Sequence, residues 1–82
     1  MDALARVVLG LLDERAPTSS ICPSDVARAA YDGDDEGWRE LMEPVREAVR
    51  GLADAGEVEV TQRGRVVDPR EAKGPVRIRR PR

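Results

Sequence analysis

The stretch VREAVRGLADAGEVEV, residues 45–60, decides the fold of this chain. Apolar residues recur in its first part at three- and four-residue spacing, which is the pattern of a helix with one buried face. These residues are Val45, Val49 and Leu52. Gly56 follows, and glycine adopts the left-handed conformation at a helix end at little cost. Polar and apolar residues then alternate over 57–61, as in a half-buried strand. The stretch therefore predicts a helix that leads through a glycine cap directly into a strand.

Upstream of this helix, Pro44 interrupts a longer apolar stripe that begins at Trp38. In a continuous helix the proline ring would clash with the carbonyl four residues earlier, and the residue before proline disfavours helical geometry. We therefore expect either a kink or a short turn at 37–42 that leads into a main helix at 44–55. The place of Trp38 in the stripe predicts a core residue.

Two further helices are predicted nearer the N-terminus. Asp2 can cap the first one, because its carboxylate accepts from the unpaired amides of the first turn. The apolar stripe of this helix consists of Leu4, Val7, Val8, Leu11 and Leu12. Residues 18–21 are expected to be extended, because β-branched and small polar residues precede Pro23. Pro23 suits the first position of a second, two-turn helix, where the missing amide costs nothing.

After the 57–61 strand, residues 62–65 have the composition of a turn, and Val66 and Val67 are expected to form the second strand of a hairpin. The alternating segment 76–79 either adds a strand or lies along the surface. The order helix, short strand, helix, helix, hairpin is that of a winged helix-turn-helix. We therefore predict an α+β fold, with a winged-helix domain over 1–72 and a basic C-terminal extension over 73–82.

Three segments carry a resemblance to a known family: ICPSDVARAA, WRELMEPVREAVRGLADAGEVEVTQRGRVVDP and KGPVRIR. Together they resemble a small bacterial family designated domain of unknown function 3253, over nearly the whole chain. The resemblance implies a winged-helix fold. It implies no established activity and no binding residues.

Charge is distributed unevenly along the 82 residues, whose net charge is −2. Residues 1–59 have a net charge of −8, whereas residues 60–82 have a net charge of +6. Such a basic segment is expected to bind phosphates, an acidic partner or the acidic body of its own domain.

The leading functional hypothesis is a non-enzymatic nucleic-acid-binding or accessory regulatory module. Arg63 and Arg65 flank the predicted wing tip, and Arg77, Arg79 and Arg80 follow in the tail. These five arginines would hold the DNA backbone, although charged tips also serve solubility and a basic tail is often simply solvated. Glutamates at 40, 43 and 47 on the third helix would repel phosphates. They argue against base recognition and leave non-specific backbone contact.

The alternative is a protein-interaction module that uses the acidic third helix and the basic tail. In that case the tail either docks on the acidic body of its own domain or captures an acidic segment of the partner.

Several other functions have no support in the sequence. The chain lacks histidine, a phosphate-binding glycine loop and a cysteine cluster, so we expect no enzyme activity, cofactor or metal site. Cys22 is expected to be a small buried apolar residue. No apolar stretch is long enough to span a membrane, and the single cysteine favours a cytoplasmic location. A monomer is the default expectation, with a dimer through an edge strand at 75–80 as the main exception.

Overall fold

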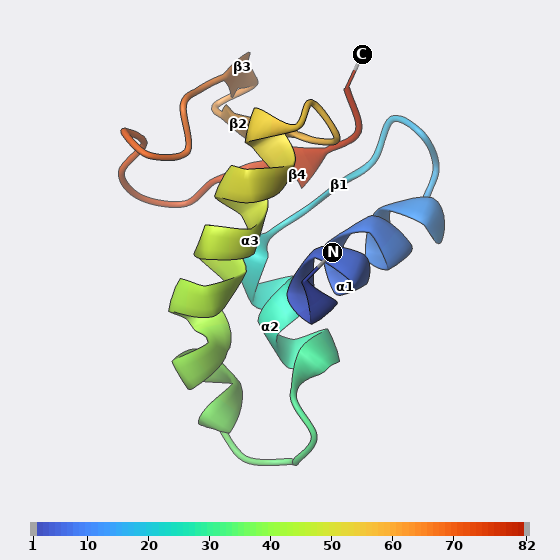
Figure 1. Cartoon of the computed structure of the whole chain (residues 1–82), viewed down its shortest axis with the longest axis vertical. Coiled ribbons are helices and arrows are strands. Elements are labelled where there is room, and N and C mark those ends of the chain that lie inside the picture. The colour runs from blue at the N-terminus through green and yellow to red at the C-terminus, as the bar shows by residue number, and fades with distance from the viewer. Residues whose placement is uncertain (1, 82) are drawn as a thin grey trace.

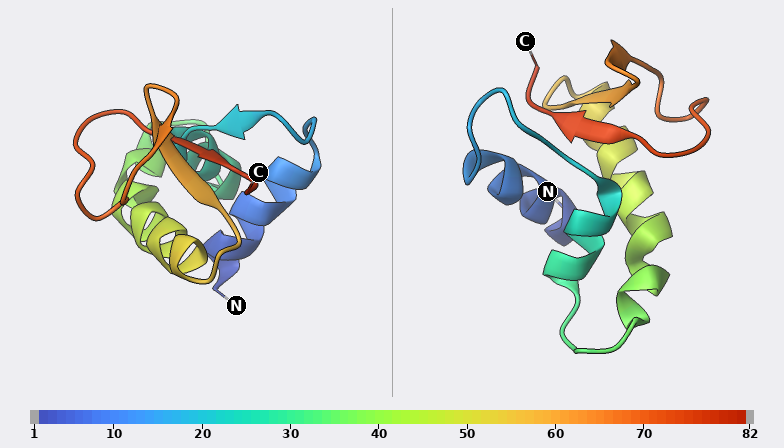
Figure 2. Two further views of the ribbon diagram at one scale, coloured as in Figure 1. Left: turned by 90° about the horizontal axis from the view of Figure 1, so that it is seen from above. Right: turned by 180° about the vertical axis from the view of Figure 1, so that it is seen from behind.

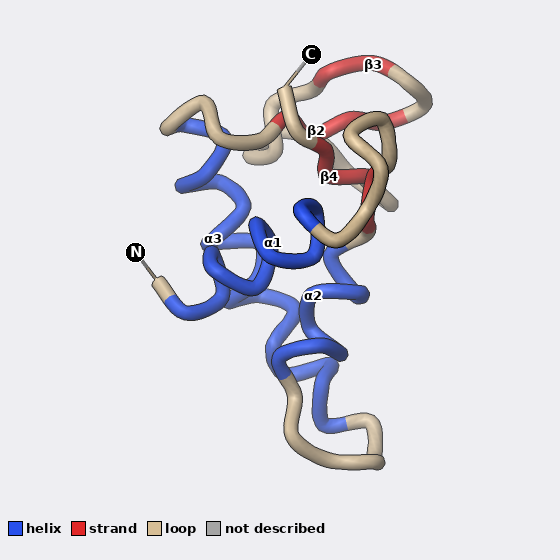
Figure 3. Tube along the Cα trace, turned by 90° about the vertical axis from the view of Figure 1, so that its right-hand side faces the viewer, coloured by secondary structure: helices blue, strands red, loops and turns tan. Residues whose placement is uncertain are grey.

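The computed structural model describes residues 2–81. The helices are α1 (Ala3–Asp13), α2 (Pro23–Ala30), the short 3₁₀ helix η1 (Gly37–Leu41) and α3 (Met42–Asp54). The strands are β1 (Ser20–Ile21), β2 (Glu59–Gln62), β3 (Arg65–Val66) and β4 (Arg77–Arg79). Helices pack against one another beneath the sheet, which closes one end of the molecule (Figures 1 and 3). The predicted α+β class is therefore confirmed.

The local signals at the helix ends act as expected. The Asp2 carboxylate accepts from the Leu4 amide at 2.8 Å and caps α1. Pro44 lies in the first turn of α3, where its missing amide removes no helical hydrogen bond. The preceding residues form η1 instead of extending α3, so the predicted turn at 37–42 is confirmed. Gly56 has a φ of +74° and ends the helix, as its position predicted.

The start of α2 uses a reciprocal arrangement between Cys22 and Asp25. The Cys22 amide donates to the Asp25 carboxylate at 3.0 Å, and the Asp25 amide donates to the Cys22 carbonyl at 3.0 Å. The hydrogen bond from the Cys22 amide holds the pKa of Asp25 below its ordinary value. Cys22 is half-buried, so the expectation of a small buried residue is wrong, because Cys22 is the N-cap of α2.

We expect Asp25→Ala to lower the free energy of unfolding by about 1 kcal/mol at neutral pH, because it removes the bond to the Cys22 amide. A carboxylate whose pKa is depressed by folding stabilises the fold above its unfolded pKa of about 3.9, and this contribution is lost as the pH falls through the folded value. Urea unfolding at several pH values should show the difference between wild type and variant shrinking below about pH 4. A difference independent of pH would contradict this assignment.

The four strands form one antiparallel sheet in the order β1-β4-β2-β3. The C-terminal segment thus forms an inner strand, with Ile78 paired to Ile21 on one side and to Val60 on the other. The alternative of a dimer through an edge strand at 75–80 loses its premise, because β4 is paired on both sides within the chain. The short β3 forms the edge beside β2.

The core lies between the three helices and the inner face of the sheet. It consists of aliphatic residues and alanines, since the chain has no phenylalanine. Its members are Ala5, Val8, Leu12, Ile21, Val26, Ala27, Val45, Ala48, Val49, Leu52, Val58, Val60 and Ile78. Trp38 is half-buried and packs against this cluster, with the guanidinium carbons of Arg28 and Arg39 at 4.3 and 4.7 Å from its ring centroid. The expectation of a core tryptophan is therefore met only in part, because Trp38 lies on η1 and keeps some exposure to solvent.

Between β3 and β4, residues 67–76 form a loop that extends outward beside α3 (Figure 2). The Gln62 side-chain amide donates to the carbonyls of Lys73 and Pro75, and this ties the loop to the end of β2. As a result, the loop, β2 and α3 share one side of the molecule.

Candidate nucleic-acid interface

The tip between β2 and β3 is a two-residue turn. Arg63 and Gly64 have φ values of +54° and +81°, the combination that a type I′ hairpin turn requires. The registers Gln62–Arg65 and Thr61–Val66 continue directly from this turn. The turn exposes the Arg63 and Arg65 side chains. Within residues 2–81, neither guanidinium has an ion pair or a hydrogen bond, so both are available to an external anion.

The basic tail, in contrast, contacts its own domain. Arg77 donates to the hydroxyl and carbonyl of Ser20, at 2.9 and 2.8 Å. Arg79 lies 3.0 Å from the Glu59 carboxylate, and the two side chains are only 17% and 27% exposed.

Arg80 completes this set of intramolecular contacts. Its guanidinium lies 2.6 Å from Asp13 and 3.8 Å from Glu57. The tail therefore docks on the acidic body of the domain, as the protein-interaction hypothesis allowed. Nucleic-acid contact by Arg77, Arg79 and Arg80 stays a prediction, and each of these residues would have to exchange an intramolecular partner to make it.

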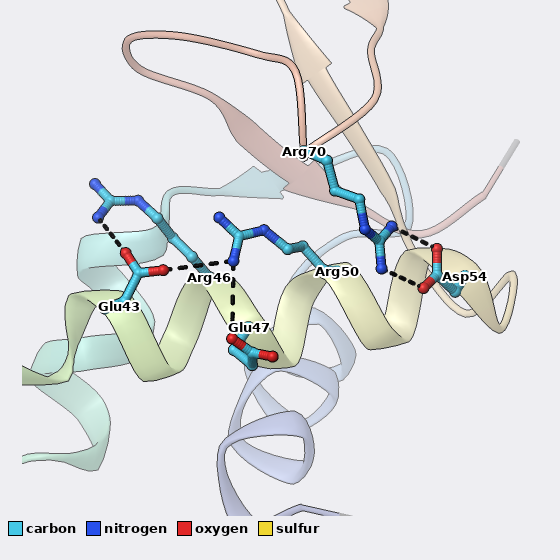
Figure 4. Close-up of polar contacts among 6 residues, drawn as sticks. All are labelled: Glu43, Arg46, Glu47, Arg50, Asp54 and Arg70. Atoms are coloured by element: carbon cyan, nitrogen blue, oxygen red, sulfur yellow. Dashed lines mark hydrogen bonds and ion pairs between the residues drawn. The ribbon is translucent and has the colours of Figure 1, made fainter.

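Along α3, charges compensate one another (Figure 4). The Glu43 carboxylate lies 3.7 Å from Arg46 and 3.4 Å from Arg50, and Arg50 lies 3.8 Å from Glu47. Glu40 is exposed on η1, just before this helix. Such exposed pairs contribute little to stability, but they reduce the attraction of this face for phosphate.

Arg70, from the loop 67–76, is held at the far end of α3. Its amide donates to the Asp68 carboxylate at 2.9 Å, and its guanidinium makes two hydrogen bonds with Asp54, at 2.8 and 2.6 Å. This bidentate contact lowers the pKa of Asp54 and raises the pKa of Arg70. Arg70 was not among the residues predicted to function, and its place in the basic segment was the signal for it.

A groove lies between the start of α2, α3 and the loop 67–76; we call it the α3 groove. Its main part has a volume of about 570 Å³, and a smaller hollow of about 110 Å³ continues it along α3. Arg46 borders both parts, Lys73 borders the larger part, and Arg50 and Arg70 border the smaller part. Since Gln62 precedes Arg63 and binds the Lys73 carbonyl, the basic lining of the groove approaches the hairpin tip.

These features define a small α+β domain with two exposed arginines at a hairpin tip and four basic residues along one groove. The chain belongs to the family described as "Protein of unknown function (DUF3253)", whose model matches residues 1–81. A search of curated proteins finds no match to the chain.

Within residues 2–81, no helix combines the length and the apolar character needed to cross a membrane. Nor does that part contain a group of three or more His, Cys, Asp or Glu side chains placed to hold a metal ion.

Proposed function

We propose that this chain is a winged-helix domain that binds the nucleic-acid backbone without catalysing a reaction. The order of the elements supports it: α1, β1, α2, α3 and β2 are followed by a returning strand that pairs beside β2. In this interpretation β4 is the returning strand, and the wing comprises residues 63–76. The wing is thus longer than the hairpin expected from the sequence, because β3 forms only a short edge within it.

The observation that carries the proposal is the pair Arg63 and Arg65 on a well-defined turn. Both side chains are exposed, and the contacts within residues 2–81 include none that neutralises them. Arginine contacts to phosphate give sequence-independent binding whose strength depends on salt. The glutamates of α3 oppose base recognition, so the proposed binding is non-specific. We also propose a cytoplasmic location, where nucleic acid is accessible and the single cysteine stays reduced.

Fluorescence anisotropy with a duplex DNA across a salt series tests this function. If Arg63 and Arg65 each neutralise one phosphate, the double variant Arg63→Gln, Arg65→Gln should reduce the slope of log K against log salt by about 1.8. The control is the double variant Arg6→Gln, Arg15→Gln. It removes the same amount of charge, at one position in α1 and one just after it, and should leave the slope unchanged.

No binding by the wild type at low salt, or binding that does not respond to salt, would refute the proposal. An equal reduction of the slope in the two double variants would show that only net charge matters and that the wing tip is not part of the interface.

A protein-interaction role is the second candidate. The observation that favours it is the composition of the α3 groove, which also identifies the chemistry of a partner.

A further inference from the structure

The α3 groove differs in charge from the rest of the molecule. The chain has 16 acidic residues, yet none of the residues that line either part of the groove is acidic. The charged lining consists of Arg46, Arg50, Arg70 and Lys73. The carboxylates that pair with Arg46, Arg50 and Arg70 lie outside this lining, so an anionic ligand in the groove would meet four cations and no lining carboxylate, which favours its approach over that of a cation.

Two of these cations are only loosely engaged. Charge-assisted bonds between nitrogen and carboxylate oxygen are typically about 2.7–2.9 Å long. The distances of Arg46 and Arg50 to Glu43 and Glu47 are 3.4–3.8 Å, whereas Arg70 holds Asp54 at 2.6–2.8 Å. Arg46 and Arg50 can thus exchange their intramolecular carboxylates for those of a ligand, while Arg70 keeps its contact with Asp54 and its position beside the groove.

Lys73 adds a cation with no competing acid. Within residues 2–81 its ammonium has no ion pair, and its carbonyl is fixed by Gln62. It borders the large part of the groove together with Arg46. A ligand carboxylate at this position would displace no partner.

Between the cations the lining is apolar. Met42 and Val76 are half-buried and border the large part, with Pro23 and Pro75 beside them. A polar sugar–phosphate backbone would gain little from contact with such an apolar surface. Among the described lining residues there is also no aromatic ring on which a base could stack. A peptide that places an apolar side chain between carboxylates matches both the lining and its charge.

We propose that the α3 groove binds an acidic segment of a partner protein. An apolar side chain of that segment packs on Met42 and Val76, and flanking carboxylates pair with Arg46 and Lys73. A volume of about 570 Å³ suits a few side chains, as in other ligand pockets. This site is separate from the wing tip and does not depend on nucleic-acid binding by Arg63 and Arg65.

The test is a titration of the whole chain, followed by backbone amide chemical shifts, with a synthetic peptide of alternating aspartate and leucine. Shifts are expected at 22–24, 42–50 and 69–76. A peptide with serine in place of leucine should bind about tenfold more weakly, because it leaves the apolar lining exposed, and a lysine–leucine peptide should not bind.

Variants of the protein locate the site. Arg46→Glu, Lys73→Glu is expected to weaken binding of the aspartate–leucine peptide about tenfold or more. The matched control Arg6→Glu, Arg15→Glu makes the same change in charge away from the groove and should bind as the wild type does. Since Arg46 and Lys73 are exposed, the variants should keep the dispersed amide spectrum of the folded domain.

Three results would overturn the proposal. The first is the absence of shifts with the aspartate–leucine peptide, or shifts outside the groove. The second is equal binding of the serine peptide or equal loss in both double variants, either of which would mean unselective charge attraction. The third is duplex DNA shifting the groove residues when the peptide does not, which would assign the groove to phosphate. The wing-tip variant Arg63→Gln, Arg65→Gln should retain peptide binding, so the two proposals can fail separately.

Discussion

Replacing Ile78 by alanine is expected to lower the free energy of unfolding by about 2–5 kcal/mol, the range for a large aliphatic side chain lost from a packed core. Ile78 is fully buried, at 0% exposure, and it faces Ile21 and Val60 across the two ladders of β4. The side chain therefore joins three strands that are far apart in the sequence. For a domain of 82 residues such a loss is a large share of the total stability.

Urea unfolding followed by far-UV circular dichroism measures this effect. Ile78→Val should cost about 0.5–1.5 kcal/mol, so the series remains measurable if the alanine variant does not fold. Val66→Ala is the matched control, because Val66 lies on the edge strand and is 57% exposed; its cost should stay within about 0.5 kcal/mol. If Ile78→Ala cost no more than Val66→Ala, residues 77–79 would not form an inner strand.

The second large effect is expected at the Glu59–Arg79 pair. Glu59→Ala should lower the free energy of unfolding by about 1.5–3 kcal/mol, as for the loss of hydrogen bonds to a charged group. One Glu59 oxygen accepts from Nε and lies 3.0 Å from Nη2 of Arg79, across the β2–β4 register. Arg79 is only 17% exposed, so without Glu59 its charge would have little access to water.

Two comparisons separate this effect from ordinary surface charge. Glu57→Ala removes a carboxylate that is 48% exposed and 3.8 Å from Arg80, and its cost should not exceed about 1 kcal/mol. Adding Arg79→Met to Glu59→Ala should recover part of the lost stability, because the unpaired cation is then absent. Equal costs for Glu59→Ala and Glu57→Ala would show that the Glu59–Arg79 pair behaves as an exposed one.

The helices could be predicted well because their signals are local. Asp2, Pro23, Pro44 and Gly56 each act within one turn of their own position, and backbone geometry decides their effect without help from distant residues. The apolar spacing in 45–60 likewise produced the buried face of α3 and the strand after it. Burial was less predictable: Trp38 has the correct spacing for the core, but it lies on η1 and is only half-buried.

The candidate site was predictable only in part. Arg63 and Arg65 follow from a turn that two adjacent residues define, so the sequence was sufficient to place them at an exposed tip. The α3 groove depends on the path of the loop 67–76, which Gln62 and Arg70 attach to β2 and α3. On its own helix Arg46 is an ordinary exposed surface charge. It borders a groove only because a loop from another part of the chain passes beside it.

The basic C-terminal segment shows which features the sequence determines by itself and which depend on the tertiary structure. The sequence by itself determined that residues 60–82 are basic and that 76–79 alternate as a strand does. The tertiary structure decided that this strand lies inside the sheet. It also decided that Arg77, Arg79 and Arg80 bind Ser20, Glu59 and Asp13, which are 57, 20 and 67 positions away. The physical reason is that strand pairing and ion pairing act between any residues that the fold brings together, whereas sequence patterns report only the preferences of neighbouring residues.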